Sequence, residues 1–237
     1  MNLVIDSGNS RIKVATFSNQ DIVKKITFHT VDELRAFLNS NLFDCAIISS
    51  VGTPNEVISS WVRAEKKFLL NYLIPLPIKI LYKTPETLGV DRIAAVCGGK
   101  DLFPSSDCLV IDAGTCITYD FVDANMDYYG GAISPGINMR FEAMHTFTKR
   151  LPLVSAAPEK MIGDSTESSM RSGVMNGVLN EVEGFINKYR MEYPDMRVVL
   201  CGGDTSFFEN NLKPTIFAAP DLVLNGLNRI LVYNASL

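Results

Sequence analysis

The hydrophobic positions of the chain form short apolar runs separated by polar turns, and these runs alternate with amphipathic stretches. Short apolar runs are typical of strands, whereas apolar residues recurring every three or four positions are typical of helices. Each half begins with strands and continues with helices and strands in alternation, which predicts an α/β fold with a mixed sheet covered by helices in each half. The predicted strands cover residues 1–28 (as a meander of three), 44–50, 108–122 (as a pair), 198–200 and 215–218. The predicted helices cover residues 31–39, 54–67, 91–103, 137–148, 166–193 and a stretch that follows Asp221.

Turn and capping residues mark the limits of these elements. Thr30 followed by Glu33 has the spacing of a capping box at the start of a helix. Residues 130–136 are so rich in Gly and Pro that we expect an irregular loop there. A short polar segment near the middle of the chain is the best candidate boundary, so we predict lobes of residues 1–107 and 108–237.

The same polar motif follows an apolar strand in each half. One strand leads to Asp6 and Gly8, and the other leads to Asp112 and Gly114. The glycine lets the backbone bend sharply near a ligand, exposed N–H groups can hold phosphate oxygens, and the aspartate can hold a cation or its bound water. One such turn is first of all a hairpin. One copy per half predicts two related lobes that offer their aspartates to a shared cleft.

Composition narrows the class of protein. Lys and Arg number 22 against 26 Asp and Glu, a net charge of -4, which argues against a nucleic-acid partner because such proteins usually carry a basic face. The five cysteines form no C-x-x-C pair and lie mostly in apolar runs, so we expect free thiols in a reducing compartment. The sequence shows neither a signal-peptide pattern nor an apolar run of about 20 residues. We therefore expect a cytoplasmic location and no membrane partner.

Other candidate residues each have a structural alternative. Lys13 lies on the strand after the first turn, where it is either a solvated charge or a cation beside a phosphate. Asp91 precedes a helix, so it is either an N-cap or a general base, with Arg92 beside it to grip a carboxylate. Gly202-Gly203 between a strand and a helix is either a plain loop or a backbone surface for adenine or ribose. No Walker-type phosphate loop is present.

Taken together and in order, these motifs resemble those of the type III pantothenate kinases. That family belongs to the superfamily of acetate and sugar kinases, heat-shock chaperone ATPases and actin, whose members have two RNase H-like lobes. The resemblance covers nearly the whole chain, and its ordered set of motifs is far more specific than any one of them. The motifs are Asp6-Ser7-Gly8-Asn9-Ser10 with Lys13, Leu88-Gly89-Val90-Asp91-Arg92, Asp112-Ala113-Gly114-Thr115, Gly130-Gly131 through Pro135-Gly136, Gly163-Asp164-Ser165-Thr166 before the helix with Ser172-Gly173, and Gly202-Gly203-Asp204.

The resemblance implies a fold, an activity and a set of site residues. It implies an active cleft between two RNase H-like lobes and ATP-dependent phosphorylation of pantothenate to 4'-phosphopantothenate, the first step of coenzyme A biosynthesis. It implies ATP, Mg²⁺ and a monovalent cation (K⁺ or NH₄⁺) as cofactors, and a homodimer. Asp91 would be the catalytic proton acceptor, and Asp112 would bind the monovalent cation. The implied ATP-binding residues are Asp6, Ser7, Gly8, Asn9, Ser10, Arg11, Ile12, Lys13 and Thr115, and the implied pantothenate-binding residues are Tyr82, Gly89, Val90, Asp91, Arg92 and Thr166.

Two departures and several alternatives remain. Ser10 stands where the family commonly has Thr, and Cys116 stands where it commonly has a small residue such as Ala. One rival is a nucleotide-binding protein of the same two-lobed fold without transfer activity, which the presence of Asp91 and Arg92 disfavours. The other is a sugar or acetate kinase, and the small lobes disfavour the sugar kinase. The long helix after Thr166 is a candidate dimer surface, with the pantothenate pocket shared between subunits, but its apolar stripe is more commonly that of a helix facing its own core.

Overall fold

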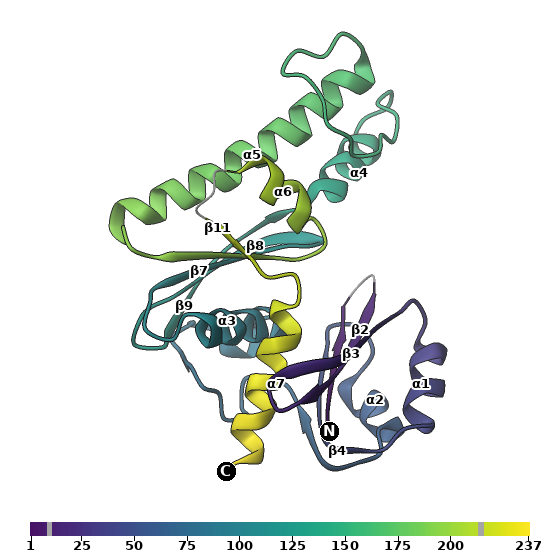
Figure 1. Ribbon diagram of the computed structural model, residues 1–237. Helices are drawn as coiled ribbons and strands as arrows, with labels where there is room; N and C mark the ends of the chain where they lie inside the picture. The colour runs from purple at the N-terminus through teal and green to yellow at the C-terminus, as the bar shows by residue number, and fades with distance from the viewer. Residues whose placement is uncertain (9–10, 213–215) are drawn as a thin grey trace. The chain divides into compact units, whose positions relative to one another are not determined.

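The computed structural model describes residues 1–8, 11–212 and 216–237 (Figure 1). Contacts divide the chain into two compact units, each described below by itself. The first unit comprises Met1–Cys108, Asp120–Gly130 and Asp221–Leu237, and the second comprises Leu109–Tyr119 and Gly131–Pro220. The division of the chain into lobes at residue 107 stays a prediction.

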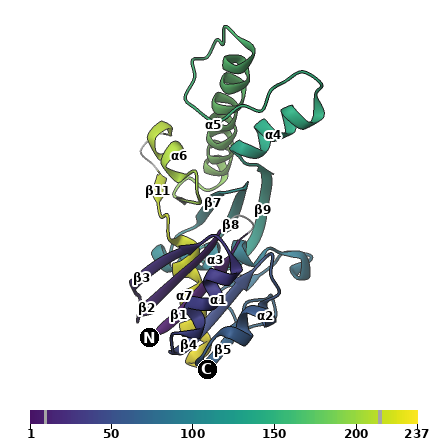
Figure 2. The same ribbon diagram turned by 90° about the vertical axis from the view of Figure 1, so that its right-hand side faces the viewer.

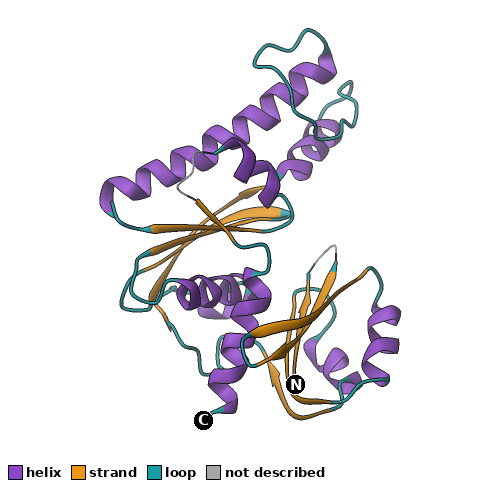
Figure 3. Cartoon of the chain, in the orientation of Figure 1, coloured by secondary structure: helices purple, strands orange, loops and turns teal. Residues whose placement is uncertain are grey.

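The elements follow the α/β pattern predicted from the sequence, with strands orange and helices purple in Figure 3. The strands are β1 (Asn2–Ser7), β2 (Ile12–Ser18), β3 (Asp21–Phe28), β4 (Phe43–Ser50), β5 (Ala64–Leu69), β6 (Lys79–Ile80), β7 (Cys108–Ala113), β8 (Cys116–Val122), β9 (Asp127–Pro135), β10 (Arg197–Cys201) and β11 (Ile216–Ala218). The helices are α1 (Val31–Asn39), α2 (Asn55–Trp61), the short 3₁₀ helix η1 (Pro85–Thr87), α3 (Val90–Leu102), α4 (Ile137–Phe147), α5 (Thr166–Glu192), α6 (Thr205–Asn211) and α7 (Leu222–Ala235).

Two mixed sheets confirm the predicted fold class. Their strand orders are β3-β2-β1-β4-β5 and β11-β10-β7-β8-β9-β6. In the first sheet β1 pairs antiparallel with β2 and parallel with β4. Successive residues of a strand point to opposite faces, so this central strand contributes to two cores.

The first sheet is covered on both faces within the first unit. Val4 and Ile47 belong to a core shared with α3 and α7, whereas Ile5 and Ile48 belong to a core that contains Leu34 of α1 and residues of α2. Figure 2 shows α1 and α2 beside the strands β1 to β5. The face that a side chain occupies on this sheet therefore determines which helices it meets.

The long helix α5 lies along the sheet of the second unit (Figure 1). Its apolar stripe is buried in the core formed with strands β7, β8 and β10, which confirms the interpretation that the stripe faces its own core. The buried members of the stripe are Met170, Val174, Val178, Val182 and Ile186.

Two predicted elements are wrong. The helix expected over residues 54–67 ends at Trp61, because the chain then forms β5 and pairs in parallel with β4. The charged residues of β5 are good helix formers, but pairing with the sheet overrides that weak preference. The loop expected over residues 130–136 is mostly strand β9. Gly130 fits there because it has a positive φ of 97°, and Pro135 ends the strand, where a missing N–H costs little.

Helix capping follows the sequence closely at α1. The Thr30 hydroxyl accepts a hydrogen bond from the backbone N–H of Glu33 (3.3 Å), and the Glu33 carboxylate accepts one from the N–H of Thr30 (3.1 Å), which confirms the capping box. Asp221 occupies the N-cap position of α7, but its carboxylate makes no cap bond and instead accepts hydrogen bonds from Lys25 at 2.7 and 2.8 Å.

Candidate active site

The first Asp-Gly turn places an aspartate beside a lysine. Asp6 on β1 lies directly opposite Lys13 on β2 in the antiparallel register, so both side chains project from the same face. The Gly8 N–H donates to the Arg11 carbonyl (3.1 Å), which closes the turn. Asn9 and Ser10 lie outside the described residues.

Ser49, which no sequence motif singles out, lies beside Asp6 on the other neighbouring strand. Ser49 on β4 is the parallel-strand partner of Asp6. Its side chain is buried, with 1% of the residue exposed, and among the described residues its hydroxyl has no hydrogen-bond partner. An unsatisfied buried hydroxyl costs about 1–3 kcal/mol. The only signal in the sequence is a pair of serines, Ser49 and Ser50, after the apolar residues of β4.

The second Asp-Gly turn lies against the Gly202-Gly203 loop within the second unit. Gly202 has a φ of 99°, and a Cβ on it would lie 2.5 Å from Asp112 Oδ1 and would also clash with the Ala113 backbone. The Asp204 N–H donates to the Ala113 carbonyl at 2.9 Å. Only glycine permits this approach without strain, so two motifs far apart in the sequence form one surface around the Asp112 carboxylate.

A third glycine motif joins the same surface. The Gly136 N–H donates to the Thr115 carbonyl at 3.1 Å, and a Cβ on Gly136 would clash with the carbonyls of Gly114 and Thr115. Thr115 is exposed beside this contact. Burial raises the pKa of Asp204, which begins helix α6 at the edge of the surface. Three of the sequence motifs thus meet in the second unit.

Glu181 on α5 anchors the connection between β9 and α4. Its carboxylate accepts hydrogen bonds from Ser134 (2.5 Å), Tyr119 (3.0 Å) and Arg140 (2.6 Å). Burial works to raise the pKa of Glu181, but these three donors lower it below its usual value. The ionised carboxylate therefore fixes the chain just before and after Gly136.

Asp91 lies in the first turn of α3, in the first unit. The N-cap of this helix is Gly89, so the interpretation of Asp91 as the N-cap is wrong. Its carboxylate accepts the N–H of Arg92 at 2.9 Å. A Cβ on Gly89 would lie 2.5 Å from Asp91 Oδ1, so the glycine makes room for this carboxylate. The Asp91 side chain remains partly exposed.

Arg92 is held by a buried aspartate, Asp120, that no sequence motif singles out. Its Nε and one Nη donate to Asp120 at 3.0 and 2.6 Å, and Asp120 is fully buried. The Tyr128 hydroxyl also donates to Asp120, at 2.6 Å. Burial lowers the pKa of Arg92, but the hydrogen bonds and charge of Asp120 outweigh it and hold that pKa above its usual value. Arg92 therefore stays charged in a fixed orientation.

Tyr82 covers the guanidinium of Arg92. The Arg92 Cζ atom lies 5.7 Å from the centre of the Tyr82 ring, a distance typical of a cation–π contact. A Cβ on Gly130 would lie 2.6 Å from the same ring, so the glycine in β9 lets the tyrosine pack here. The structure thus brings three predicted pantothenate-binding positions, Tyr82, Asp91 and Arg92, into one neighbourhood.

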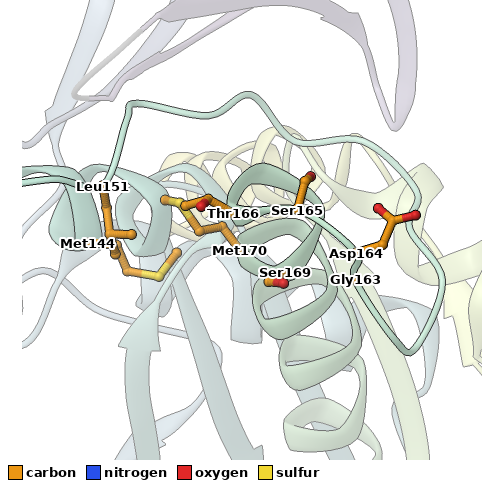
Figure 4. A pocket seen from close by; sticks show the side chains of 8 residues that line it. All are labelled: Met144, Leu151, Gly163, Asp164, Ser165, Thr166, Ser169 and Met170. Atoms are coloured by element: carbon orange, nitrogen blue, oxygen red, sulfur yellow. The ribbon is translucent and has the colours of Figure 1, made fainter.

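The predicted residue Thr166 lines an open pocket of about 640 Å³ in the second unit (Figure 4). Thr166 begins α5, whose N-cap Ser165 forms a capping box with Ser168. One side of the pocket carries hydroxyls and a carboxylate, and the other is apolar. Its lining residues are Met144, Leu151, Gly163, Asp164, Ser165, Thr166, Ser169 and Met170. Such a surface suits a small ligand with both polar and apolar parts.

The described residues contain no group of three or more His, Cys, Asp or Glu side chains arranged to hold a metal ion. Magnesium at phosphoryl-transfer sites is held by one or two carboxylates, waters and the phosphates themselves. Asp6 at its strand end fits that smaller requirement. Among the helices of the described ranges, none has the length and apolar character needed to cross a membrane.

Comparison with known proteins identifies the family. The model of the family described as "Type III pantothenate kinase" matches residues 2–188. The chain belongs to this family. A type III pantothenate kinase from Phocaeicola vulgatus is 46% identical, with 100% of each chain covered. Family membership confirms the resemblance inferred from the motifs and makes the chain a phosphotransferase that uses ATP and a divalent metal.

Solved structures support the fold. A protein from Campylobacter jejuni, described as a conserved putative Baf family transcriptional activator, superposes with a TM-score of 0.66 at 23% identity, covering 99% of this chain and 100% of that one. The activator of the 2-hydroxyisocaproyl-CoA dehydratase from Clostridium difficile, which contains bound ADPNP, superposes with a TM-score of 0.52 at 13% identity, covering 99% and 94%. At such low identities the likeness is one of fold. The roles of individual residues stay predictions.

Proposed function

We propose that this chain transfers the γ-phosphoryl group of ATP to the primary hydroxyl of pantothenate, giving 4'-phosphopantothenate in the first step of coenzyme A biosynthesis. The observation that carries the proposal is full-length similarity to type III pantothenate kinases, 46% identical in one case, in a chain whose Asp91 and Arg92 stand side by side at the start of α3. We place the enzyme in the cytoplasm, because all five cysteines are free thiols.

Each residue has a role suited to its chemistry. Phosphoryl transfer needs positioning and charge neutralisation more than covalent help. Asp91 accepts the hydroxyl proton. Lys13 neutralises phosphate charge, and Thr115 contributes its exposed hydroxyl. Asp6 would hold a hydrated magnesium ion, which would supply further charge neutralisation. Arg92 has five N–H donors, of which Asp120 engages those on Nε and one Nη, and the other Nη is assigned to the pantothenate carboxylate.

The test is an assay of ADP release with pantothenate against a panel of sugars and acetate. Of these acceptors, only pantothenate should raise ADP release above the background hydrolysis of ATP. Faster turnover with a sugar or with acetate would replace the proposal by one of the rival kinases. Nucleotide binding without turnover on any acceptor would leave the non-catalytic alternative.

The Asp112 surface is proposed to hold a monovalent cation. A Cβ on Gly202 would lie 2.5 Å from Asp112 Oδ1 and a Cβ on Gly114 would lie 3.2 Å from it, so the two glycines leave room beside the carboxylate. Activity should therefore rise when sodium buffers are replaced by potassium or ammonium buffers. Initial rates at constant ionic strength measure this, with Asp112→Asn expected to lose the dependence. Equal rates in sodium, potassium and ammonium would contradict the cation site.

We also propose a homodimer in which the Thr166 pocket of one subunit completes the Asp91–Arg92 site of the other. Supporting this, the segment from the end of α4 to the start of α5 exposes several large apolar side chains, as an interface would. They are Phe147, Leu153, Met161 and Ile162.

Mixing two inactive variants tests this arrangement. Asp91→Asn removes the proton acceptor, and Thr166→Arg blocks the pocket at an exposed position. In a symmetric dimer with shared sites, a random mixture of the two should recover roughly a quarter of the wild-type rate, because half the dimers are mixed and each of these has one intact site. An active monomer in sedimentation, or no recovery in a mixture shown to exchange subunits, would contradict the shared site.

A further inference from the structure

Lys13, Asp6 and Ser49 form one row across the first sheet. Asp6 on β1 is the partner of Lys13 on β2 and of Ser49 on β4. Partners directly opposite each other project from the same face. That face also carries Val4 and Ile47, whose core contains residues of α3 and α7. The serine hydroxyl is therefore a close neighbour of the carboxylate assigned to the nucleotide site.

The surroundings of Ser49 give its hydroxyl little else to bind. On the side away from Asp6, the chain of β5 continues to Leu70, which is buried and belongs to the same apolar core. The Leu70 N–H donates to the Ile48 carbonyl at 2.8 Å and is therefore already hydrogen-bonded. Among the described residues the Ser49 hydroxyl has no partner. Alanine here would avoid the cost of an unsatisfied buried hydroxyl, and such local inconsistencies tend to occur at functional sites.

We propose that Ser49 is a positioning residue for Asp6. In the nucleotide complex its hydroxyl donates a hydrogen bond to the Asp6 carboxylate and fixes the orientation in which that carboxylate holds the hydrated magnesium ion of the nucleotide. Groups that orient a metal-binding carboxylate strongly affect metal affinity. The inference rests on the proposed function, since it takes Asp6 to be part of the ATP site.

The opposite face of the same sheet provides a matched control. Thr16 on β2 is also buried, and in the described part of the chain its hydroxyl likewise has no partner. Its cross-strand partners are Leu3 and Lys24, so no carboxylate lies beside it in the row. Thr16→Val and Ser49→Ala each remove one buried, unpaired hydroxyl. Neither should lower the melting temperature of the ligand-free protein, and only Ser49→Ala should affect the nucleotide.

Calorimetric titration with a non-hydrolysable ATP analogue, in magnesium and in EDTA, tests the proposal. In magnesium Ser49→Ala should weaken binding about tenfold, equivalent to about 1.4 kcal/mol, whereas in EDTA it should bind as the wild type does. Thr16→Val should match the wild type in both buffers. In an Asp6→Asn background, Ser49→Ala should have no further effect, because the hydroxyl acts through that carboxylate.

Three results would overturn the inference. Wild-type affinity of Ser49→Ala in magnesium would show that the hydroxyl is not used. An equal loss in EDTA would show that it does not act through the metal-holding carboxylate, and so would an undiminished loss in the Asp6→Asn background. A wild-type chain that binds no nucleotide would instead contradict the proposed function, so the two failures are distinguishable.

Discussion

Asp91→Asn should lower kcat about 10²–10⁴-fold, the usual contribution of a well-placed general base. The primary hydroxyl of pantothenate is a poor nucleophile while it keeps its proton, and a carboxylate within hydrogen-bond reach can orient it and accept that proton. The asparagine oxygen can still accept the Arg92 N–H that Asp91 binds at 2.9 Å. The melting temperature should therefore change little, beyond a small loss of the favourable interaction between the charge and the helix N-terminus, about 0.3–1 kcal/mol.

Asp101→Asn is the matched control, because Asp101 lies at the far end of α3 and pairs with Arg229 at 3.4 Å on the surface. It should keep wild-type kcat. Steady-state kinetics, thermal denaturation and calorimetric ATP titration together separate loss of the base from loss of fold. Near-normal kcat in a folded Asp91→Asn variant would remove Asp91 from the mechanism and leave positioning alone to explain the reaction.

Asp120→Ala should lower the free energy of unfolding by about 3–5 kcal/mol, the usual cost of removing one partner from a buried ion pair. The variant leaves the Arg92 guanidinium buried without its counter-charge, and it also removes the acceptor of the Tyr128 hydroxyl. The side chains of Arg92 and Asp120 are only 7% and 0% exposed, so little water reaches the guanidinium to replace the bonds to Asp120. Denaturant unfolding measures the loss.

Asp127→Ala provides the comparison for Asp120→Ala. Asp127 lies 3.6 Å from Lys79, whose side chain is 71% exposed. Such surface pairs contribute about 0–1 kcal/mol, so this variant should stay close to wild-type stability. Equal losses in the two variants would mean that the buried pair is no more important to the fold than a surface one.

Local signals in the sequence predicted most of the fold. The Thr30 and Glu33 spacing gave the start of α1 correctly, because a capping box is made by neighbours in sequence. The sequence predicts too long a helix α2, because the residues after Trp61 have helical preferences that only pairing with β4 overrides. The sequence does not predict strand β9, because its glycines disfavour a strand, whereas in the structure Gly130 permits the packing of Tyr82.

The sequence predicts those residues of the candidate site that stand in a motif. It does not predict those whose importance depends on a contact in the folded chain. The aspartates of the two turns, and Asp91 with Arg92, stand in recognisable motifs. Asp120 stands in an apolar strand with no motif around it, and its importance follows only from the burial of Arg92 beside it. Ser49 was missed for the same reason, since its relation to Asp6 depends on the pairing of β1 with β4. That the two Asp-Gly turns face one cleft stays a prediction.

Identification of the reaction product is the decisive experiment on the proposed pantothenate kinase activity. The purified chain is incubated with ATP, magnesium, potassium and pantothenate, and the product is analysed by mass spectrometry and phosphorus NMR. We expect stoichiometric ADP and a phosphomonoester on the primary hydroxyl of pantothenate, both greatly reduced with Asp91→Asn. Hydrolysis of ATP to ADP and inorganic phosphate with pantothenate unmodified would contradict it.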